Sequence, residues 1–349
     1  MQKQITTNWP ILTLVMPTYN ASKVVAKSIE SYLHLKRLAN IQVSLIVVDD
    51  ASTDDTVAII EGYIRAENSI KLIKSRINSG PGAARNRALN EIQSGYVGFI
   101  DTDDQILYDS YLNIFYEGVD YAADLITFDA EIVGAGITSS RYDFSRLSLN
   151  RPEMVRNCIR GLLDGSVIFS IYSIDLIKSK KICFAAGFYE DIYFSYSAIM
   201  QAKRLFISNN IGYRKFNSTG SITNTISEKH ILGMLSACSS VRCKALEIIP
   251  SKYEKFEDDF SFGLYGYVKT LLDSIVKHND TLSKLITLMD FLYHSYSKYP
   301  DFLLHRSRSE TQVDMLVSEF LKVWREDGDK ATFINSIKKQ KTSLSLGAK

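Results

Sequence analysis

The chain begins with a regular alternation of short apolar runs and longer stretches of amphipathic spacing. Four apolar runs have the length and composition of buried strands, at residues 11–16, 43–48, 70–74 and 96–100. Three stretches between them have helical spacing, at residues 21–38, 54–66 and 82–92. Strands separated by helices are joined by right-handed crossovers into a parallel sheet covered on both faces. The first third is therefore predicted to be an α/β sheet domain.

The pattern is more mixed in the middle of the chain and helical near its end. A strand is predicted at residues 124–133 and a strand or loop at 141–147. A helix is predicted at 152–164, a loop entering a helix at 187–202, and two short strands around a turn at 204–216. From about residue 228 glycine becomes scarce and helical periodicity dominates. We expect one domain over 1–225 and a mainly helical region over 226–349, whose basic tail 337–349 is mobile.

Polar clusters follow the predicted strands, at the edge where open parallel sheets bind ligands. The most acidic is DTDD, in which Asp101, Asp103 and Asp104 lie within four positions. One aspartate suffices to cap a helix, which is the simplest interpretation of the motif. Three carboxylates fit a divalent cation site better, because Mg²⁺ or Mn²⁺ takes one or two carboxylates together with substrate phosphate oxygens.

Two other segments join this edge. DDASTDDT follows the second strand, and its Asp50 is placed to accept a hydrogen bond from a ligand, although an ordinary Asx turn explains the cluster equally well. NSGPGAARNRAL contains a tight turn and a helix start with Arg85 and Arg87 just inside, which suits an anion. The alternative is that both arginines are solvated. The segment is not a P-loop, because GxxxxGK[ST] is absent.

Together these segments resemble family 2 of the glycosyltransferases, an inverting group with the GT-A fold, a Rossmann-like and mainly parallel sheet flanked by helices. PTYN (17–20), VVDDASTDDT (47–56), NSGPGAARNRAL (78–89) and FIDTDDQI (99–106) match the family's motifs in order, with Ala51 where the family usually has glycine. The resemblance is specific over residues 11–106, weaker over 107–225 and absent beyond.

The resemblance implies a role for each matching residue on the donor side. Thr18 and Tyr19, in the segment that begins with Pro17, would hold the uracil and ribose of a UDP-sugar, with Asp50 addressing the base. Asp101 would contact the ribose or sugar, and Asp103 with Asp101 would bind Mn²⁺ or Mg²⁺. Asp104 would assist donor-sugar binding or support the site from behind, and Arg85 would brace the acidic motif or the donor.

The resemblance also implies an acidic pair on the acceptor side. FYEDIYF is similar to the family's ED motif, so Asp191 would be the general base and Glu190 would recognise the acceptor or orient the base. From the residues alone, helix capping is the competing interpretation of this pair. In IGYRKFNSTGSIT, Arg214 would approach the diphosphate, with Lys215 as a competitor and Ser221 or Thr223 as a lid.

The function implied is metal-dependent, inverting transfer of a hexosyl or N-acetylhexosaminyl group from a UDP-sugar to a glycan or lipid-linked acceptor, in bacterial surface polysaccharide synthesis. The alternative is a non-catalytic nucleotide-sugar or glycan-binding protein on the same fold, which would be expected to lack the DxD or ED acids. A nucleotidyltransferase is disfavoured because PTYN occupies the place of its glycine-rich phosphate loop.

Composition narrows the setting. A net charge of +2 does not favour nucleic acid as a partner. The cysteines are scattered without CxxC spacing, which is typical of reduced thiols in a cytoplasmic protein. The first residues lack the apolar core of a signal peptide. Lys338, Lys339 and Lys341 would favour contact with the inner face of the cell membrane, although a solvated tail is the simpler expectation. An alternative to membrane contact by the C-terminal region is that the apolar faces of its helices pair two subunits.

Overall fold

The computed structural model describes residues 10–133, 137–139, 150–216, 226–249, 256–279, 281–298 and 312–346. The chain forms two compact units. The first consists of residues 1–154 and 164–218 and contains the sheet, and the second consists of residues 155–163 and 219–349. The segment predicted around 141–147 lies outside the described residues.

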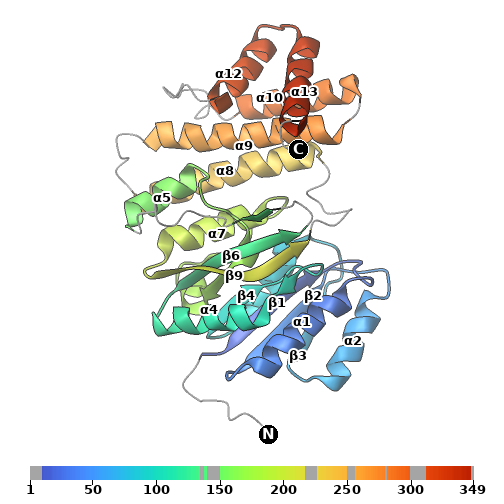
Figure 1. The fold of residues 1–349 in the computed structure, drawn as a ribbon, viewed down its shortest axis with the longest axis vertical. Coiled ribbons are helices and arrows are strands. Elements are labelled where there is room, and N and C mark those ends of the chain that lie inside the picture. Colours follow the sequence, from blue (N-terminus) through green and yellow to red (C-terminus); the bar gives the residue numbers. More distant parts are fainter. Residues whose placement is uncertain are drawn as a thin grey trace. The chain divides into compact units, whose positions relative to one another are not determined.

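The described strands of the first unit form one mixed, nine-stranded sheet (Figure 1). They are β1 (Leu12–Thr18), β2 (Val43–Asp49), β3 (Ile70–Lys74), β4 (Tyr96–Phe99), β5 (Gln105–Ile106), β6 (Leu125–Val133), β7 (Ile137–Ser139), β8 (Ser170–Ser173) and β9 (Leu205–Phe216). Their order is β3-β2-β1-β4-β8-β6-β9-β5, with β7 on β6. The first four are mutually parallel, as are β6 and β9, and the remaining pairs are antiparallel. The α/β fold expected from the alternating pattern is confirmed.

The order in which strands are added to the sheet reverses after β3. Chain order runs outward through β1, β2 and β3 and then returns to β4 on the other side of β1. Right-handed crossovers therefore place α1 (Val25–Leu38) and α2 (Thr56–Ala66) on one face and α3 (Pro81–Glu91) on the other. α3 packs on β1 and β2, while α1 contacts both α2 and α4 (Tyr108–Asp120). The gap between β1 and β4 is a topological switch point, the usual ligand crevice of such sheets.

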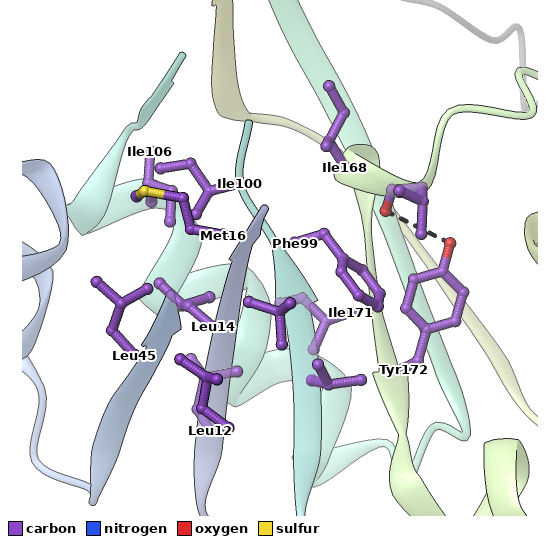
Figure 2. Close-up of a cluster of buried hydrophobic side chains, with 14 of the residues drawn as sticks. Leu12, Leu14, Met16, Leu45, Phe99, Ile100, Ile106, Ile168, Ile171 and Tyr172 are labelled. Carbon is purple, nitrogen blue, oxygen red and sulfur yellow. Dashed lines mark hydrogen bonds between the residues drawn. The ribbon is translucent and has the colours of Figure 1, made fainter. Parts of the chain in front are cut away.

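The core explains why the first strands are apolar without interruption. All seven residues of β1 are buried. Figure 2 shows Leu12, Leu14 and Met16 of β1 in the same cluster as Phe99 of β4 and Tyr172 of β8. A strand covered by helices on both faces has no solvent side and needs no polar alternation.

β9 is one continuous strand, so the prediction of two short strands over 204–216 was wrong. The polar run SNN resembles a turn, but it forms a bulge. Ser208 pairs with Phe128, Ile211 with Asp129 and Tyr213 with Ala130, so Asn209, Asn210 and Gly212 of β9 have no counterpart on β6. A bulge absorbs extra residues without ending the strand.

The remaining helices complete both units. The first unit also holds α6 (Ile174–Ser179), α7 (Glu190–Gln201) and the 3₁₀ turn Val167–Phe169, and α5 (Arg151–Ile159) crosses the division between the units. The second unit contains α8 (Glu228–Ile248), α9 (Phe256–His278), α10 (Leu282–Ser297), α12 (Gln312–Arg325) and α13 (Lys330–Leu346). A helical C-terminal region is thus confirmed. Within the described ranges, no helix is both long and apolar enough to span a bilayer.

α13 includes residues 337–346, which the sequence pattern assigned to a mobile tail. Helical structure in this segment does not test its mobility, which stays a prediction. Phe333, Ile334 and Ile337 are all buried, which gives the helix an apolar face that packs within the second unit. α13 contacts α9, α10 and α12.

Candidate functional site

The loops after β1 and β2 are joined by hydrogen bonds. The N–H of Asn20 donates to Ser52 Oγ over 2.8 Å, and the N–H of Thr53 donates to Asn20 Oδ1 over 2.8 Å. Before them, Thr18 is buried, and its Oγ1 accepts and donates no hydrogen bond within the described part of the chain. The ring of Tyr19 is 49% exposed. Tyr19 is therefore accessible to a ligand, whereas the Thr18 hydroxyl is enclosed, and contact of either residue with a nucleoside stays a prediction.

Asp50 is distinct from its acidic neighbours. Asp49 and Asp54 form the ordinary turn contacts that the sequence left open, with Asp49 Oδ2 accepting from the N–H of Ser52. The carboxylate of Asp50 is buried and accepts from the N–H groups of Ser79 and Gly80, over 2.8 and 2.6 Å. It also accepts from Arg87 over 3.2 Å. Asp50 therefore ties the loop before α3 to the end of β2, and its contact with a base stays a prediction.

Ala51 has a φ of +67°, in the left-handed region that favours glycine. Ala51→Gly is expected to stabilise the protein by about 1 kcal/mol, because relief of a left-handed alanine exceeds the added entropy of the unfolded glycine. The shift of the urea unfolding midpoint measures the effect.

The control for this change is Ala58→Gly, at an exposed position inside helix α2. There the same substitution is expected to cost about 1 kcal/mol, since glycine disfavours a helix interior. Destabilisation by both variants would show that the turn at Ala51 is not strained.

Arg85 connects the two acidic motifs. Its guanidinium is buried, with Nη2 2.8 Å from Asp101 Oδ1 and Nη1 2.8 Å from Glu190 Oε1. Burial alone would lower the pKa of Arg85, but the charges of Asp101 and Glu190 outweigh it and raise the pKa. Because this bridge is buried, the interpretation of Arg85 as a solvated helix arginine is excluded. Arg87 is the half-exposed partner of Asp50.

Close packing at the start of α3 makes this bridge possible. A Cβ on Gly82 would lie 2.6 Å from Glu190 Cγ and 3.0 Å from the carbonyl oxygen of Ala185. Only glycine lets the first turn of α3 approach Glu190 so closely. The glycine in NSGPG that the sequence marked as a turn residue thus also serves a contact with residues about a hundred positions away.

Asp104 faces inward from the DTDD motif. Its Oδ2 accepts from the Tyr213 hydroxyl over 3.0 Å and its Oδ1 from the N–H of Phe216 over 2.8 Å. Burial, together with the charge of Asp101, raises the pKa of Asp104 to about 7. With both oxygens engaged on β9, the geometry favours support of the site over direct contact with a donor sugar.

Asp101 and Asp103 are both partly exposed, so theirs are the carboxylates of the DTDD motif that a ligand can reach. Among the residues described, no group of three or more His, Cys, Asp or Glu side chains is arranged to hold a cation by itself. A cation here would therefore need further oxygen ligands. Mg²⁺ and Mn²⁺ obtain such ligands from substrate phosphates and water, so this donor set fits one that arrives with a diphosphate.

Glu190 and Asp191 form the first turn of α7, directly after Tyr189 in the left-handed region. Neither is the capping residue of that helix. Burial raises the pKa of Asp191 to about 7, with the Glu190 charge acting in the same direction and Arg85 opposing both. A carboxylate that titrates near neutrality is suited to accept a proton from a hydroxyl group.

Lys215, not Arg214, lies on the site's side of β9. Arg214 Nε pairs with Glu131 Oε2 over 2.7 Å and lines a pocket of about 610 Å³ with residues of α1, β5 and α4. Tyr213 and Lys215 point to the other face by strand alternation, and the charge of Lys215 acts on both Asp104 and Asp191. Of the residues considered for the diphosphate, the geometry therefore favours Lys215 over Arg214. Ser221 and Thr223 lie outside the described residues.

Two contributors were missed by sequence reasoning. Tyr213 contacts the DTDD motif through its hydroxyl, and Ser28 Oγ on α1 lies 2.6 Å from the carbonyl oxygen of Thr102 and 2.9 Å from that of Asp104. Tyr213 is one of 20 tyrosines, and Ser28 is a serine inside a helix. Strand and helix spacing distinguish neither residue. Tyr213 lies in the segment that resembles the family's late motif, but that resemblance assigned it no role.

Comparison with known proteins agrees with this architecture. Residues 13–178 match the family model described as Glycosyl transferase family 2. An uncharacterized glycosyltransferase of Haemophilus influenzae is 39% identical over 102 residues, which cover 29% of this chain and 40% of that protein. A poly(ribitol-phosphate) beta-glucosyltransferase of Bacillus spizizenii is 25% identical over 211 residues, which cover 58% of this chain and 31% of that protein. The chain thus matches less than half the length of either relative.

A solved structure extends the likeness beyond the sheet. The crystal structure of S. aureus TarS 1–349 in complex with UDP is similar with a TM-score of 0.66 and 20% identity, over 94% of this chain and 91% of that one. At that identity the likeness concerns the fold, and it includes the helical C-terminal region. The chain is therefore similar to glycosyl transferase family 2 over residues 13–178, and it has a GT-A fold followed by a helical C-terminal region.

Proposed function

We propose that this chain is a metal-dependent, inverting glycosyltransferase that moves a sugar from a UDP-sugar to a glycan or lipid-linked acceptor. The observation that carries the proposal is the buried guanidinium of Arg85, which contacts Asp101 of the DxD motif and Glu190 of the ED motif. The guanidinium of Arg85 thus links an acid of the donor side to an acid of the acceptor side.

On the donor side, Tyr19 is exposed at the end of β1, beside the switch point, and would contact the nucleoside together with Thr18, whose buried hydroxyl has no hydrogen-bond partner among the described residues. Pro17 joins them to the acidic motif, because its carbonyl oxygen accepts a hydrogen bond from Thr102 Oγ1 over 2.6 Å. The structure of S. aureus TarS with the same fold was solved with UDP, which supports a uridine nucleotide as the donor.

Asp103 and Asp101 would hold Mn²⁺ or Mg²⁺ together with the diphosphate. When bound, such a cation supplies Lewis-acid stabilisation of the negative charge that develops on the leaving diphosphate. The positive charge of Lys215 acts on the same region and would add to that stabilisation. Arg85 holds Asp101 through one of its oxygens, so the other oxygen remains for the ligand.

On the acceptor side, Asp191 would accept the proton of the attacking hydroxyl as its oxygen bonds to the anomeric carbon. The bond from that carbon to the diphosphate oxygen breaks at the same time, so the configuration inverts. The pKa of Asp191, raised to about 7 by burial, keeps it a competent base near neutral pH. Glu190 is fixed by Arg85 and would orient the base or the acceptor.

The acceptor is proposed from the relatives. The Bacillus spizizenii protein is named for glucosyl transfer to poly(ribitol-phosphate), and Staphylococcus aureus TarS is named for N-acetylglucosaminyl transfer to the same polymer. These names support a bacterial polymer as the acceptor and a hexose or N-acetylhexosamine as the sugar. We assign acceptor binding or association of subunits to the second, helical unit. A cytoplasmic site, in peripheral contact with the membrane, is part of the same proposal.

A donor screen tests the proposal. The protein is incubated with UDP-hexoses and UDP-N-acetylhexosamines in the presence of Mn²⁺, with UDP release and products followed by mass spectrometry. Wild-type protein is expected to release UDP with at least one donor, and Asp103→Ala and Asp191→Ala are expected to lose about 100-fold or more in rate. Full activity in both variants would refute the site. UDP binding without turnover would favour the non-catalytic alternative.

A further inference from the structure

The hydroxyl group of Tyr213 lies beneath the DTDD motif. It accepts a hydrogen bond from the N–H of Asp101 over 3.0 Å and donates one to Asp104 Oδ2 over 3.0 Å. Tyr213 is completely buried, and its ring packs edge-on against Phe169 at 5.6 Å between centroids. One side chain of β9 therefore connects the first residue of the motif to the last.

The rest of the motif is held from other directions. Ser28 approaches the carbonyl oxygens of Thr102 and Asp104 from α1. Thr102 Oγ1 donates to the carbonyl oxygen of Pro17 at the end of β1. None of these contacts fixes the backbone at Asp101, whose carboxylate meets Arg85. Among the described residues, the Tyr213 hydroxyl is the side-chain group that accepts a hydrogen bond from the N–H of Asp101.

We propose that Tyr213 is a positioning residue for nucleotide-sugar binding, which sets the orientation of Asp101 and Asp103 toward the diphosphate and its cation. This inference rests on the proposed function. Without the hydroxyl, the N–H of Asp101 and one oxygen of Asp104 both lose a buried partner, which is costly. The turn is then expected to relax, and Asp101 and Asp103 lose the arrangement that a bound ligand requires.

Tyr111 provides a matched control. It is as completely buried as Tyr213, and its ring packs against Phe128 at 5.3 Å. Its hydroxyl, however, makes no hydrogen bond to any described residue. Tyr213→Phe and Tyr111→Phe each remove one buried hydroxyl from the same unit and keep the ring, so only the first removes the contact with the motif.

Three measurements test the inference. Calorimetric titration with UDP and Mn²⁺ is expected to give about tenfold weaker binding for Tyr213→Phe, equivalent to about 1.4 kcal/mol, and wild-type binding for Tyr111→Phe. Hydrogen exchange without ligand is expected to be faster in the 101–104 segment of Tyr213→Phe alone. The KM for the UDP-sugar should rise in parallel with the dissociation constant.

The outcomes separate this inference from the function on which it rests. Wild-type protein that takes up no UDP would overturn the proposed function and the ligand role of Tyr213 with it. Uptake by wild-type protein, with equal affinity in Tyr213→Phe, would overturn the inference alone. So would a lowered melting temperature in Tyr213→Phe with unchanged UDP affinity and unchanged exchange at 101–104, because the hydroxyl would then serve stability only.

Discussion

Asp191→Asn is expected to lower kcat for sugar transfer by about 10²- to 10⁴-fold, the usual contribution of a general base. The amide keeps the size of the side chain but accepts no proton. UDP affinity should remain near the wild-type value, because the donor-side residues Thr18, Tyr19 and Asp103 are unchanged. Initial rates and calorimetry on the same preparations measure both quantities.

The control is Asp175→Asn, which removes a carboxylate from the first turn of another helix, α6, where it is exposed. It should leave kcat unchanged. Equal losses of activity in the two variants would point to a general effect of charge, and retention of activity by Asp191→Asn would remove the residue from the mechanism.

The same residue should govern the dependence on pH. Its pKa of about 7 means that the deprotonated, active form increases from pH 6 to pH 8, so kcat/KM should rise about tenfold over that range. Stability should change in the opposite direction. Between the ordinary value of 3.8 and about 7, the folded protein retains a proton that the unfolded chain releases, so folding weakens as the pH rises. Asp191→Asn should lose the rise in kcat/KM and the part of the stability change that Asp191 contributes, while the part that Asp104 contributes remains in both proteins.

Arg85→Met is expected to destabilise the first unit by about 3–5 kcal/mol, the cost of removing one partner from a buried ion pair. Asp101 and Glu190 would then face each other without the cation that lies between them. Transfer activity should be lost even where the variant stays folded. Urea unfolding and the UDP-release assay measure these effects.

Arg85→Lys separates charge from geometry. A lysine restores the positive charge but is a single point charge, whereas the planar guanidinium contacts two acids at once. It should recover part of the stability and little activity. Arg65→Met, at an exposed position in the last turn of α2, should change stability by no more than about 0.5 kcal/mol. If Arg85→Met unfolded at the wild-type midpoint, the bridge would have no structural role.

Sequence patterns predicted the part of the fold that local spacing determines. The strands of the first third were placed within two residues of their ends, because each is a continuous apolar run between helices. α4 and β8 were not anticipated, and β9 was divided. In β9 the outcome depends on how the SNN segment pairs with β6, a partner that lies about eighty residues earlier in the chain.

The candidate site shows the same limit. Adjacent aspartates in DTDD look equivalent in sequence, yet Asp104 is turned inward by Tyr213 and Phe216, more than a hundred residues away. Arg214 and Lys215 are neighbours with similar charge, and only the pairing of β9 decides which one faces the acids. Motif spacing therefore indicates which residues gather at the sheet edge, while long-range contacts determine their orientation.

The two glycines of NSGPG are required for different reasons, and substitution by D-alanine would distinguish these reasons. Gly80 has a φ of +86° and open space where a Cβ would stand, whereas Gly82 has an ordinary helical backbone and no space. A D-alanine introduced by chemical synthesis should be accepted at position 80, because its handedness suits that torsion angle. At position 82, neither enantiomer should be tolerated without moving Glu190 or disturbing the helix.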